Sequence, residues 1–209
     1  MLTRFSRQLS RVACKLIKHN HAEEEEEAKP DELVYREDNH IYFYAEVNVT
    51  SISILMVLLR EAQDHCIFFT HRNRIDELPI YLHLMTNGGE LLAAFPMMDV
   101  IESSKIPVYS VIEGATASAG TMISVVCHKR FIRPRAYMLI HQLRSGCVGT
   151  MRELSDEYSN LSDNMKVIRD IYLSHTKLNS KKLDQLLDHD IWLPSKLAID
   201  YGLADEIYK

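Results

Sequence analysis

Glycine is scarce in this 209-residue chain, which holds only seven of them, about half the share of roughly 7% found in average proteins. Six of the seven fall in three close pairs: Gly88 with Gly89, Gly114 with Gly120, and Gly146 with Gly149. Because glycine is rare elsewhere, these three places predict tight turns or close backbone approach.

Cysteine is also sparse and unpaired in sequence. Cys14, Cys66, Cys127 and Cys147 stand far apart and form no C-x-x-C pair, which excludes a disulfide framework and a zinc site of the common spacing. Reduced thiols favour a reducing, cytoplasmic compartment. Neither of the glycine-rich nucleotide-binding patterns is present, so we expect no cofactor and no metal.

Positive charge is not in excess. The chain has 24 basic and 29 acidic side chains, a net charge of −5, which argues against nucleic acid and anionic membranes as partners. The longest uncharged stretch, 114–127, has 14 residues, whereas a membrane-spanning helix needs roughly 20 mostly apolar ones. We therefore expect a soluble protein.

The first 32 residues differ from the rest. Residues 1–20 contain five basic and no acidic side chains, with apolar residues at helical spacing, and Glu23–Glu27 form an acidic run typical of a solvated linker. We expect an amphipathic arm with its linker over 1–32 and one domain over 33–209. A partner-binding arm is favoured over an organelle transit peptide, which would place the protein in an organelle lumen.

Strand and helix patterns alternate from Val34 onward. The patterns predict strands at 41–47, 79–85 and 107–112, with short strands near Phe131 and Met138, and helices at 90–103, 118–127 and from a Thr50 cap to about Gln63. This order predicts an α/β fold with a largely parallel sheet and helical crossovers.

A long helix of about 25 residues is predicted after Gly149. Its apolar residues step by three and four, as in a coiled coil, and we call them the seam: Met151, Leu154, Tyr158, Leu161, Met165, Ile168 and Tyr172. A second copy of the chain covering the seam is the favoured explanation. The alternative is that the helix packs along its own domain.

Three residues have the character of a catalytic relay. Ser118 follows a strand and opens an apolar helix, which suits a nucleophile, although it could simply cap that helix. His141 ends the apolar run 136–140 and is a candidate base, the alternative being a core histidine. Asp190 is the candidate for orienting the imidazole, with Asp188 as its nearest rival.

Backbone amides near glycine could serve as an oxyanion hole. Thr86-Asn87-Gly88-Gly89 lies at a predicted strand end, so the Gly88 and Ala119 N–H groups could both point at a carbonyl oxygen beside Ser118. The alternative is an ordinary turn or a phosphate nest.

Six blocks, in order, resemble the proteolytic subunit of the Clp protease over residues 33–209. They are Tyr81–Gly89, Gly114–Gly120, Arg130–Pro134, Met138–Gln142, Gly146–Gly149 and Trp192–Asp205. The resemblance implies a crotonase-like fold with a projecting handle helix. It also implies a serine endopeptidase in stacked homo-oligomeric rings around a chamber, acting on polypeptides delivered by a Clp-type ATPase unfoldase.

The resemblance also implies roles for particular residues. Ser118, His141 and Asp190 match the nucleophile, base and orienting carboxylate, Gly88 and Ala119 match the oxyanion hole, and Gly89, Gly146 and Gly149 match substrate-binding positions, the loop 146–149 aligning the substrate as an added strand.

The chain departs from the family pattern in five places, one of which is a shortening near 127–129, away from Ser118 and His141. Thr86-Asn87 replace the usual Ser-Pro and Ala119 the usual methionine, and neither change removes a backbone N–H. Residues 66–77 form an insertion, and residues 1–40 do not resemble the axial loop that engages the ATPase.

Two other functions are compatible with the residues. The altered N-terminus motivates a catalytically silent or assembly-modulating paralogue. An acyl-CoA hydratase or isomerase on the same fold would need a carboxylate near the oxyanion hole, for which Glu113 is the nearby candidate.

Overall fold

The computed structural model describes residues 33–209. The expected arm, acidic linker and domain boundary near residue 32 therefore lie outside the described residues. The strands are β1 Val34–Glu37, β2 His40–Phe43, β3 Ile80–Thr86, β4 Val108–Ala117, β5 Lys129–Ile132, β6 Tyr137–Leu139, β7 Leu193–Pro194 and β8 Glu206–Ile207. The helices are α3 Val49–Asn73, α4 Leu91–Glu102, α5 Ala119–Val125, α6 Met151–His175, α7 Ser180–Leu187 and α8 Ser195–Asp200.

The strands form one mixed sheet in the order β1-β2-β3-β4-β5-β8, with β6 paired to β4 and β7. Strands β2, β3, β4, β5 and β8 are parallel neighbours, and β1–β2 and β6–β7 are antiparallel. The prediction of a largely parallel sheet with helical crossovers is confirmed.

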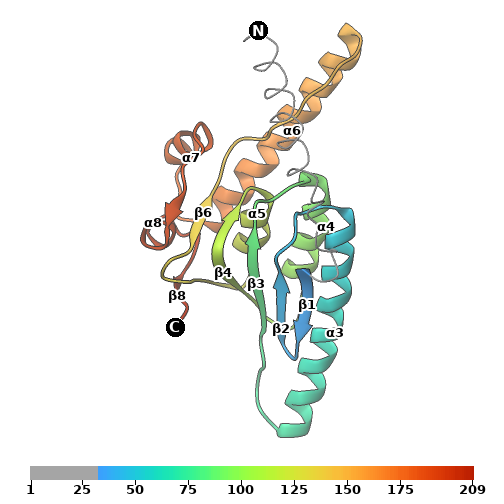
Figure 1. Ribbon diagram of the computed structural model, residues 1–209, viewed down its shortest axis with the longest axis vertical. Helices are drawn as coiled ribbons and strands as arrows, with labels where there is room; N and C mark the ends of the chain where they lie inside the picture. The colour runs from blue at the N-terminus through green and yellow to red at the C-terminus, as the bar shows by residue number, and fades with distance from the viewer. Residues whose placement is uncertain (1–32) are drawn as a thin grey trace, which may run out of the picture.

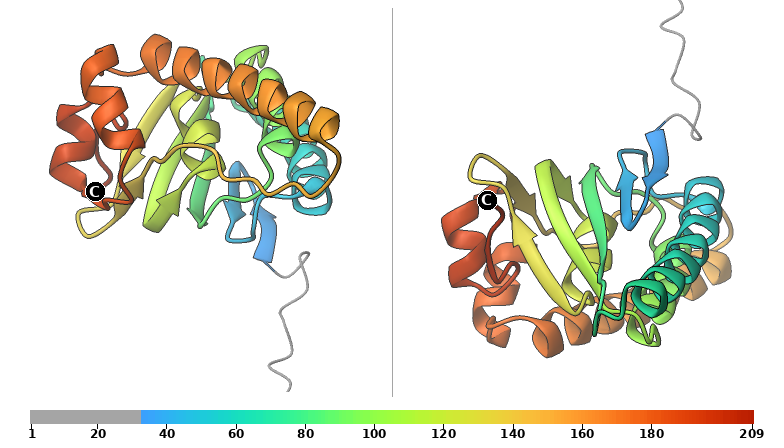
Figure 2. Two further views of the ribbon diagram at one scale, coloured as in Figure 1. Left: turned by 90° about the horizontal axis from the view of Figure 1, so that it is seen from above. Right: turned by 90° about the horizontal axis from the view of Figure 1, so that it is seen from below.

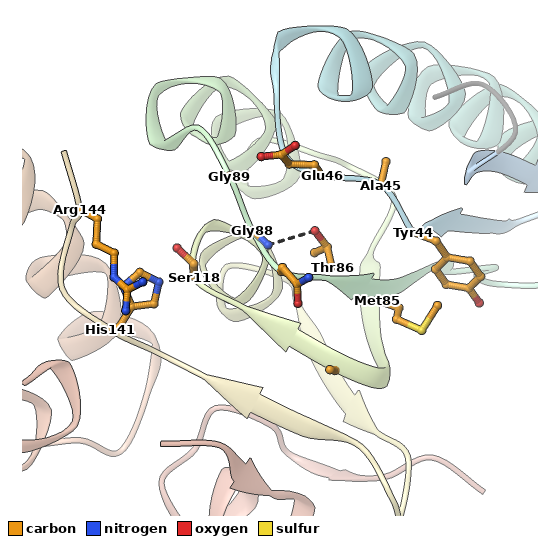
Figure 3. Close-up of a pocket in the computed structure, with 12 residues that line it drawn as sticks. Tyr44, Ala45, Glu46, Met85, Thr86, Gly88, Gly89, Ser118, His141 and Arg144 are labelled. Atoms are coloured by element: carbon orange, nitrogen blue, oxygen red, sulfur yellow. Dashed lines mark hydrogen bonds between the residues drawn. The ribbon is translucent and has the colours of Figure 1, made fainter. Parts of the chain in front are cut away.

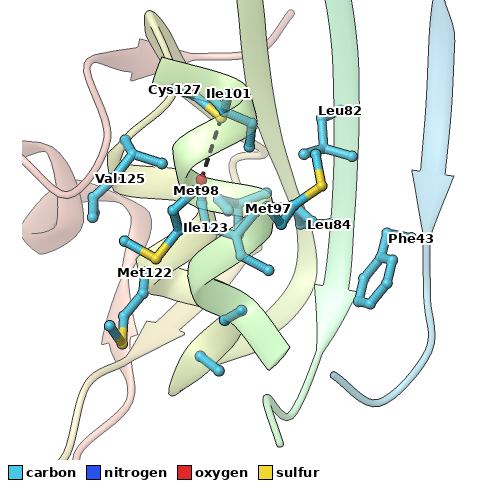
Figure 4. Close-up of a cluster of buried hydrophobic side chains, with 14 of the residues drawn as sticks. Phe43, Leu82, Leu84, Met97, Met98, Ile101, Met122, Ile123, Val125 and Cys127 are labelled. Carbon is cyan, nitrogen blue, oxygen red and sulfur yellow. Dashed lines mark hydrogen bonds between the residues drawn. The ribbon is translucent and has the colours of Figure 1, made fainter. Parts of the chain in front are cut away.

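Helices cover one face of this sheet (Figures 1 and 2). Met97 and Ile101 of α4 lie in one buried cluster with Leu82 and Leu84 of β3 and Ile123 of α5, all fully buried (Figure 4). Because alternate residues of a strand point to opposite faces, the odd-numbered residues of β3 and β4 face away from this core. That second face carries aromatic rings, among them Tyr81, Tyr109 and Phe131.

Helix α3 differs from its prediction at both ends. It begins after Asn48, not Thr50, because the Asn48 side chain accepts the Ser51 N–H while the Ser51 hydroxyl accepts the Asn48 N–H, a reciprocal cap. It continues to Asn73, ten residues beyond Gln63. Most of the insertion over 66–77 is therefore an extension of this helix.

Helix α6 matches its prediction, with 25 residues and a reciprocal cap between Thr150 and Glu153. Ile168 and Tyr172 of the seam are buried, whereas Met151 and Tyr158 are 82% and 75% exposed. The helix thus packs on the domain through its second half and projects with its first half (Figure 1). Among residues 33–209, no helix is long and apolar enough to cross a bilayer.

Candidate active site

Ser118 occupies the single residue between β4 and α5. Its backbone has φ 53° and ψ −127°, a positive φ that is costly for a residue with a side chain. Its hydroxyl makes no capping hydrogen bond, so the alternative in which Ser118 caps the helix is wrong. The side chain is presented to a cavity instead of to its own helix.

Two hydroxyl groups connect this strained backbone to α6. The Thr121 hydroxyl donates to the Ser118 carbonyl oxygen at 2.7 Å, and the Tyr172 hydroxyl lies 2.6 Å from the Thr121 oxygen. Since Thr121 has one hydroxyl hydrogen and uses it on Ser118, Tyr172 is the donor of the second bond. Burial raises the pKa of Tyr172, so the phenol keeps the hydrogen that this bond requires.

The pairing of β4 with β6 brings His141 to the same cavity as Ser118. Ala117 lies beside Leu139, and the Ser118 N–H donates to the Leu139 carbonyl at 2.9 Å, which leaves His141 two residues further along. The His141 Nδ1 lies 2.6 Å from the Gln142 carbonyl oxygen. Because a carbonyl only accepts, Nδ1 carries the hydrogen and Nε2 is free to accept a proton.

Asp190 is brought to His141 by the antiparallel pair β6–β7. Met138 lies opposite Leu193 in this pair, and beyond it Asp188 and Asp190 both line one cavity with His141. A hydrogen bond from the Gln142 N–H to the Leu187 carbonyl ties the two segments together. Asp190 and its rival Asp188 therefore both stand near His141.

The three side chains share cavities without forming a relay. Ser118 and His141 line a cavity of about 590 Å³ (Figure 3), and His141 and Asp190 line another of about 340 Å³. Within residues 33–209, however, no hydrogen bond joins Ser118 to His141 or His141 to Asp190. The Asp190 carboxylate is instead paired with the guanidinium of Arg144.

Gly88 lies against Ser118, the candidate nucleophile. Its φ is 92°, and a Cβ at this position would stand 2.6 Å from the Ser118 Cβ and 3.1 Å from the Ala119 nitrogen, so only glycine fits. The two amides of the predicted oxyanion hole are therefore neighbours. The Gly88 N–H donates to the Thr86 hydroxyl at 3.1 Å (Figure 3).

Position 89 requires glycine because of a different contact, with the backbone of Val47. A Cβ there would stand 2.1 Å from the Val47 carbonyl oxygen, which accepts the Glu90 N–H at 2.7 Å. This bridge to Val47 holds the Gly88–Gly89 segment at the cavity wall.

The loop between His141 and α6 is exposed and belongs to no strand. A Cβ on Gly146 would meet nothing within 4 Å, whereas one on Gly149 would stand 2.6 Å from a Glu153 carboxylate oxygen. Space thus explains Gly149, which lies against the first turn of α6, but not Gly146.

The Glu113 carboxylate forms hydrogen bonds on the aromatic face of the sheet. Its carboxylate accepts hydrogen bonds from Tyr44 at 2.6 Å and from Arg133 at 3.1 Å, and lies 3.0 Å from the His83 Nδ1. Burial works to raise the pKa of Glu113, but these three bonds outweigh it and lower the pKa. The carboxylate is not among the groups that line the Ser118 cavity, so it is poorly placed for hydratase chemistry.

Two further features bear on which groups could react. Burial raises the pKa of Cys66 to about 11 and that of Cys127 to about 12, so both thiols are protonated at neutral pH. Within the described part of the chain, no group of three or more His, Cys, Asp or Glu side chains is placed to hold a metal ion. The cavity of about 590 Å³, which we call the wide cavity, is lined by Ser118, His141 and the Gly88–Gly89 backbone, with Arg144 and Glu46 as its charged residues.

Sequence reasoning missed Arg144, Thr121 and Tyr172. Arg144 stands in a polar, glycine-containing loop where an arginine is normally solvated, and Tyr172 counts as one more apolar residue of the seam. The only local signal for Tyr172 is its hydroxyl on a buried stripe, which needs a partner.

The fold identifies the class first. A parallel sheet with crossover helices and a long projecting helix is the crotonase-like α/β fold with its handle helix, as predicted. A family model described as Clp protease matches residues 39–209. The chain therefore belongs to the Clp protease family.

Individual relatives agree with this assignment. The chain is 34% identical over 133 residues to the ATP-dependent Clp protease proteolytic subunit 2 of Treponema denticola, an alignment that spans 63% of this chain and 66% of that protein. It is 30% identical over 133 residues to subunit 1 of Chlamydia abortus, spanning 62% and 69%. Among solved structures, a mutant of ClpP1 from Listeria monocytogenes matches with a TM-score of 0.67 at 25% identity, covering 79% of this chain and 88% of that one.

Proposed function

We propose that this protein is a serine endopeptidase with Ser118 as nucleophile, His141 as base and Asp190 as the orienting carboxylate. The observation that carries the proposal is the position of Ser118. Its backbone is strained and its hydroxyl uncapped, it shares a cavity with His141, and the two glycine-flanked amides lie beside it.

The chemistry follows from these positions. The His141 Nε2 takes the hydroxyl proton as the Ser118 Oγ attacks the peptide carbonyl carbon, and the Gly88 and Ala119 N–H groups bind the oxygen that becomes negative. The Gly88 N–H turns from the Thr86 hydroxyl to do so. His141 then gives the proton to the leaving nitrogen as the C–N bond breaks, and water hydrolyses the acyl-enzyme by the reverse route.

Assembly into stacked homo-oligomeric rings is part of the proposal. The exposed first half of the α6 seam supports an opposing copy of the helix as its cover. The unpaired loop with Gly146 and Gly149 supports binding of the substrate backbone as an added strand next to Gly89. Relatives named ATP-dependent proteolytic subunits support a Clp-type unfoldase as a partner for folded substrates.

The domain organisation and the compartment are proposals as well. Residues 33–209 would be the peptidase domain, and 1–32 an arm that precedes it. Free thiols at Cys66, Cys127 and Cys147 support a reducing compartment, for which we propose the cytoplasm.

A catalytically silent, assembly-modulating paralogue is the second candidate. The observation that favours it is the ion pair between Arg144 and Asp190, which occupies the carboxylate that the relay needs.

Labelling and hydrolysis test the proposal together. We expect a serine-reactive phosphonate to modify Ser118 in the assembled full-length protein, and Ser118→Ala to lower turnover of a fluorogenic peptide about a millionfold. Ser103→Ala, at an exposed serine after α4, is the control and should keep full activity.

Absence of any adduct on Ser118 would instead favour the silent paralogue. Peptide hydrolysis that is lost in Ser118→Ala and kept in Glu113→Gln would rule out the hydratase alternative.

A further inference from the structure

Arg144 is a charged residue of the Ser118 cavity that the proposed mechanism does not use. It follows His141 by three residues, lines the wide cavity with Ser118 and His141, and lines the cavity that His141 shares with Asp190. Its guanidinium pairs with the Asp190 carboxylate.

This ion pair opposes the role proposed for Asp190. A guanidinium beside a carboxylate offsets its negative charge, so Asp190 stabilises an imidazolium less well while the pair persists. His141 accordingly gives its Nδ1 hydrogen to the Gln142 carbonyl. The structure thus shows Asp190 held by Arg144 and His141 held by the backbone.

The ion pair between Arg144 and Asp190 can readily be replaced by a pair between Arg144 and another carboxylate. The Arg144 side chain is 69% exposed and that of Asp190 is 51% exposed, and water screens such surface pairs so that they contribute little. Another carboxylate that enters the cavity offers Arg144 the same planar, two-oxygen partner.

The space beside Ser118 offers a substrate side chain one cationic partner. A smaller cavity adjoins Ser118 and Ala119, with apolar walls that include Leu91 and Met122, and Arg144 is the one permanently charged residue among its lining groups, all within the described chain. The side chain of the residue whose carbonyl is attacked lies nearest to Ser118, so this cavity is where that side chain would go. In the wide cavity the other charged residue, Glu46, lies beside Gly89 (Figure 3), where it repels an acidic group.

From this arrangement we infer that Arg144 selects substrates with an acidic residue just before the scissile bond and couples that choice to activation. The substrate carboxylate draws the guanidinium away from Asp190, which then accepts the His141 Nδ1 hydrogen and completes the relay. The inference rests on the proposed peptidase function and adds a substrate class to it.

The coupling makes a specific kinetic prediction. A neutral substrate leaves Asp190 paired and is turned over slowly, whereas an acidic one frees Asp190, so the preference is expressed in kcat as well as in KM. Because exposed ion pairs contribute little free energy, we expect the preference for the acidic substrate to be about fivefold.

The test uses two fluorogenic peptides that differ only in Glu or Gln before the cleaved bond. We expect the full-length wild-type protein to turn over the Glu peptide about fivefold faster, and Arg144→Met to raise kcat on the Gln peptide and remove the difference. Arg135→Met, at an exposed arginine between β5 and β6, is the matched control and should keep the preference.

The possible outcomes separate the inference from the proposed function. Equal kcat values for the two peptides in the wild type, or a preference for Glu that survives in Arg144→Met, would overturn the inference while Ser118 still reacts with phosphonate. A protein that neither cleaves the peptides nor reacts with phosphonate overturns both.

Discussion

At the scale of single residues, the position of Ser118 depends on groups that do not touch the substrate. A positive φ at a serine persists only when surrounding contacts hold it. Here the Leu139 carbonyl holds the Ser118 N–H, and Thr121, itself bonded to Tyr172, holds the Ser118 carbonyl. Ser118, the proposed nucleophile, is thereby connected to helix α6 through two hydroxyl groups.

Removing one of these hydroxyls should weaken the fold measurably. Tyr172→Phe deletes a fully buried donor, and we expect the free energy of unfolding to fall by about 1 kcal/mol, measured by urea denaturation. Tyr158→Phe removes a phenol from the exposed half of the same helix and should change nothing. Equal stabilities for Tyr172→Phe and wild type would show that this bond is not formed in solution.

At the scale of elements, α6 has two halves with different surroundings. Ile168 and Tyr172 are buried against the domain, while Met151, Leu154 and Tyr158 are exposed. An apolar stripe in water costs free energy, and a second copy of the helix is the cover that ring assembly would supply. Because the same helix holds Thr121 through Tyr172, we expect assembly and peptidase activity to rise and fall together.

A charge placed on the exposed seam tests this expectation. Tyr158→Glu should lower the particle mass seen by mass photometry and reduce peptide hydrolysis, because a carboxylate cannot be buried between two helices without a partner. Asn160→Glu puts the same charge on the opposite side of the helix, where 3.6 residues per turn point it away from the seam, and should assemble normally. Unchanged mass for Tyr158→Glu would contradict seam-mediated assembly.

At the scale of the whole molecule, the sheet is covered by helices on one face and carries a polar and aromatic cluster on the other. His40 Nδ1 lies 2.9 Å from His83 Nε2, and His83 contacts Glu113. Burial lowers the pKa of His83 although the bond to Glu113 opposes it, and burial also lowers the pKa of His40 against the nearby Asp38 and Glu37. Tyr44 and Arg133 are the other groups that face Glu113.

These shifts predict how stability depends on pH. The unfolded chain binds protons at His40 and His83 more readily than the folded one, so their contribution is complete above the ordinary histidine pKa of 6.5 and is lost as pH falls below it. Glu113, whose pKa is also lowered, adds a further loss below its ordinary value of 4.5.

Urea unfolding at pH of about 7.5 and about 5.5 measures the histidine part of this dependence. We expect the free energy of unfolding to be lower at the acidic pH, and the difference to shrink in His83→Gln. His71→Gln, at an exposed histidine near the end of α3, should keep the wild-type difference. A free energy of unfolding that does not fall on acidification would show that the cluster does not couple to folding.

Much of the fold could be predicted because its signals are local. The period of two in 79–85 and the steps of three and four after Gly149 each record which side of one element is buried, and both elements were found where predicted. The predicted end of α3 was wrong because Ile67 and Phe68 in its last turns are exposed. Apolar residues there do not mark a buried side of the helix, so the sequence shows no helical periodicity.

The sequence by itself determined the order of strands and helices and the few places where glycine allows close approach, because these depend on each residue and its near neighbours. It also singled out Ser118, His141 and Asp190 as candidates. Only the tertiary structure decided that Arg144 pairs with Asp190, that Tyr172 supports Thr121, and that Glu113 belongs to a cluster away from Ser118. Each of these contacts joins segments far apart in the chain, and the register between paired strands and the packing of helices on the sheet decide which distant side chains meet.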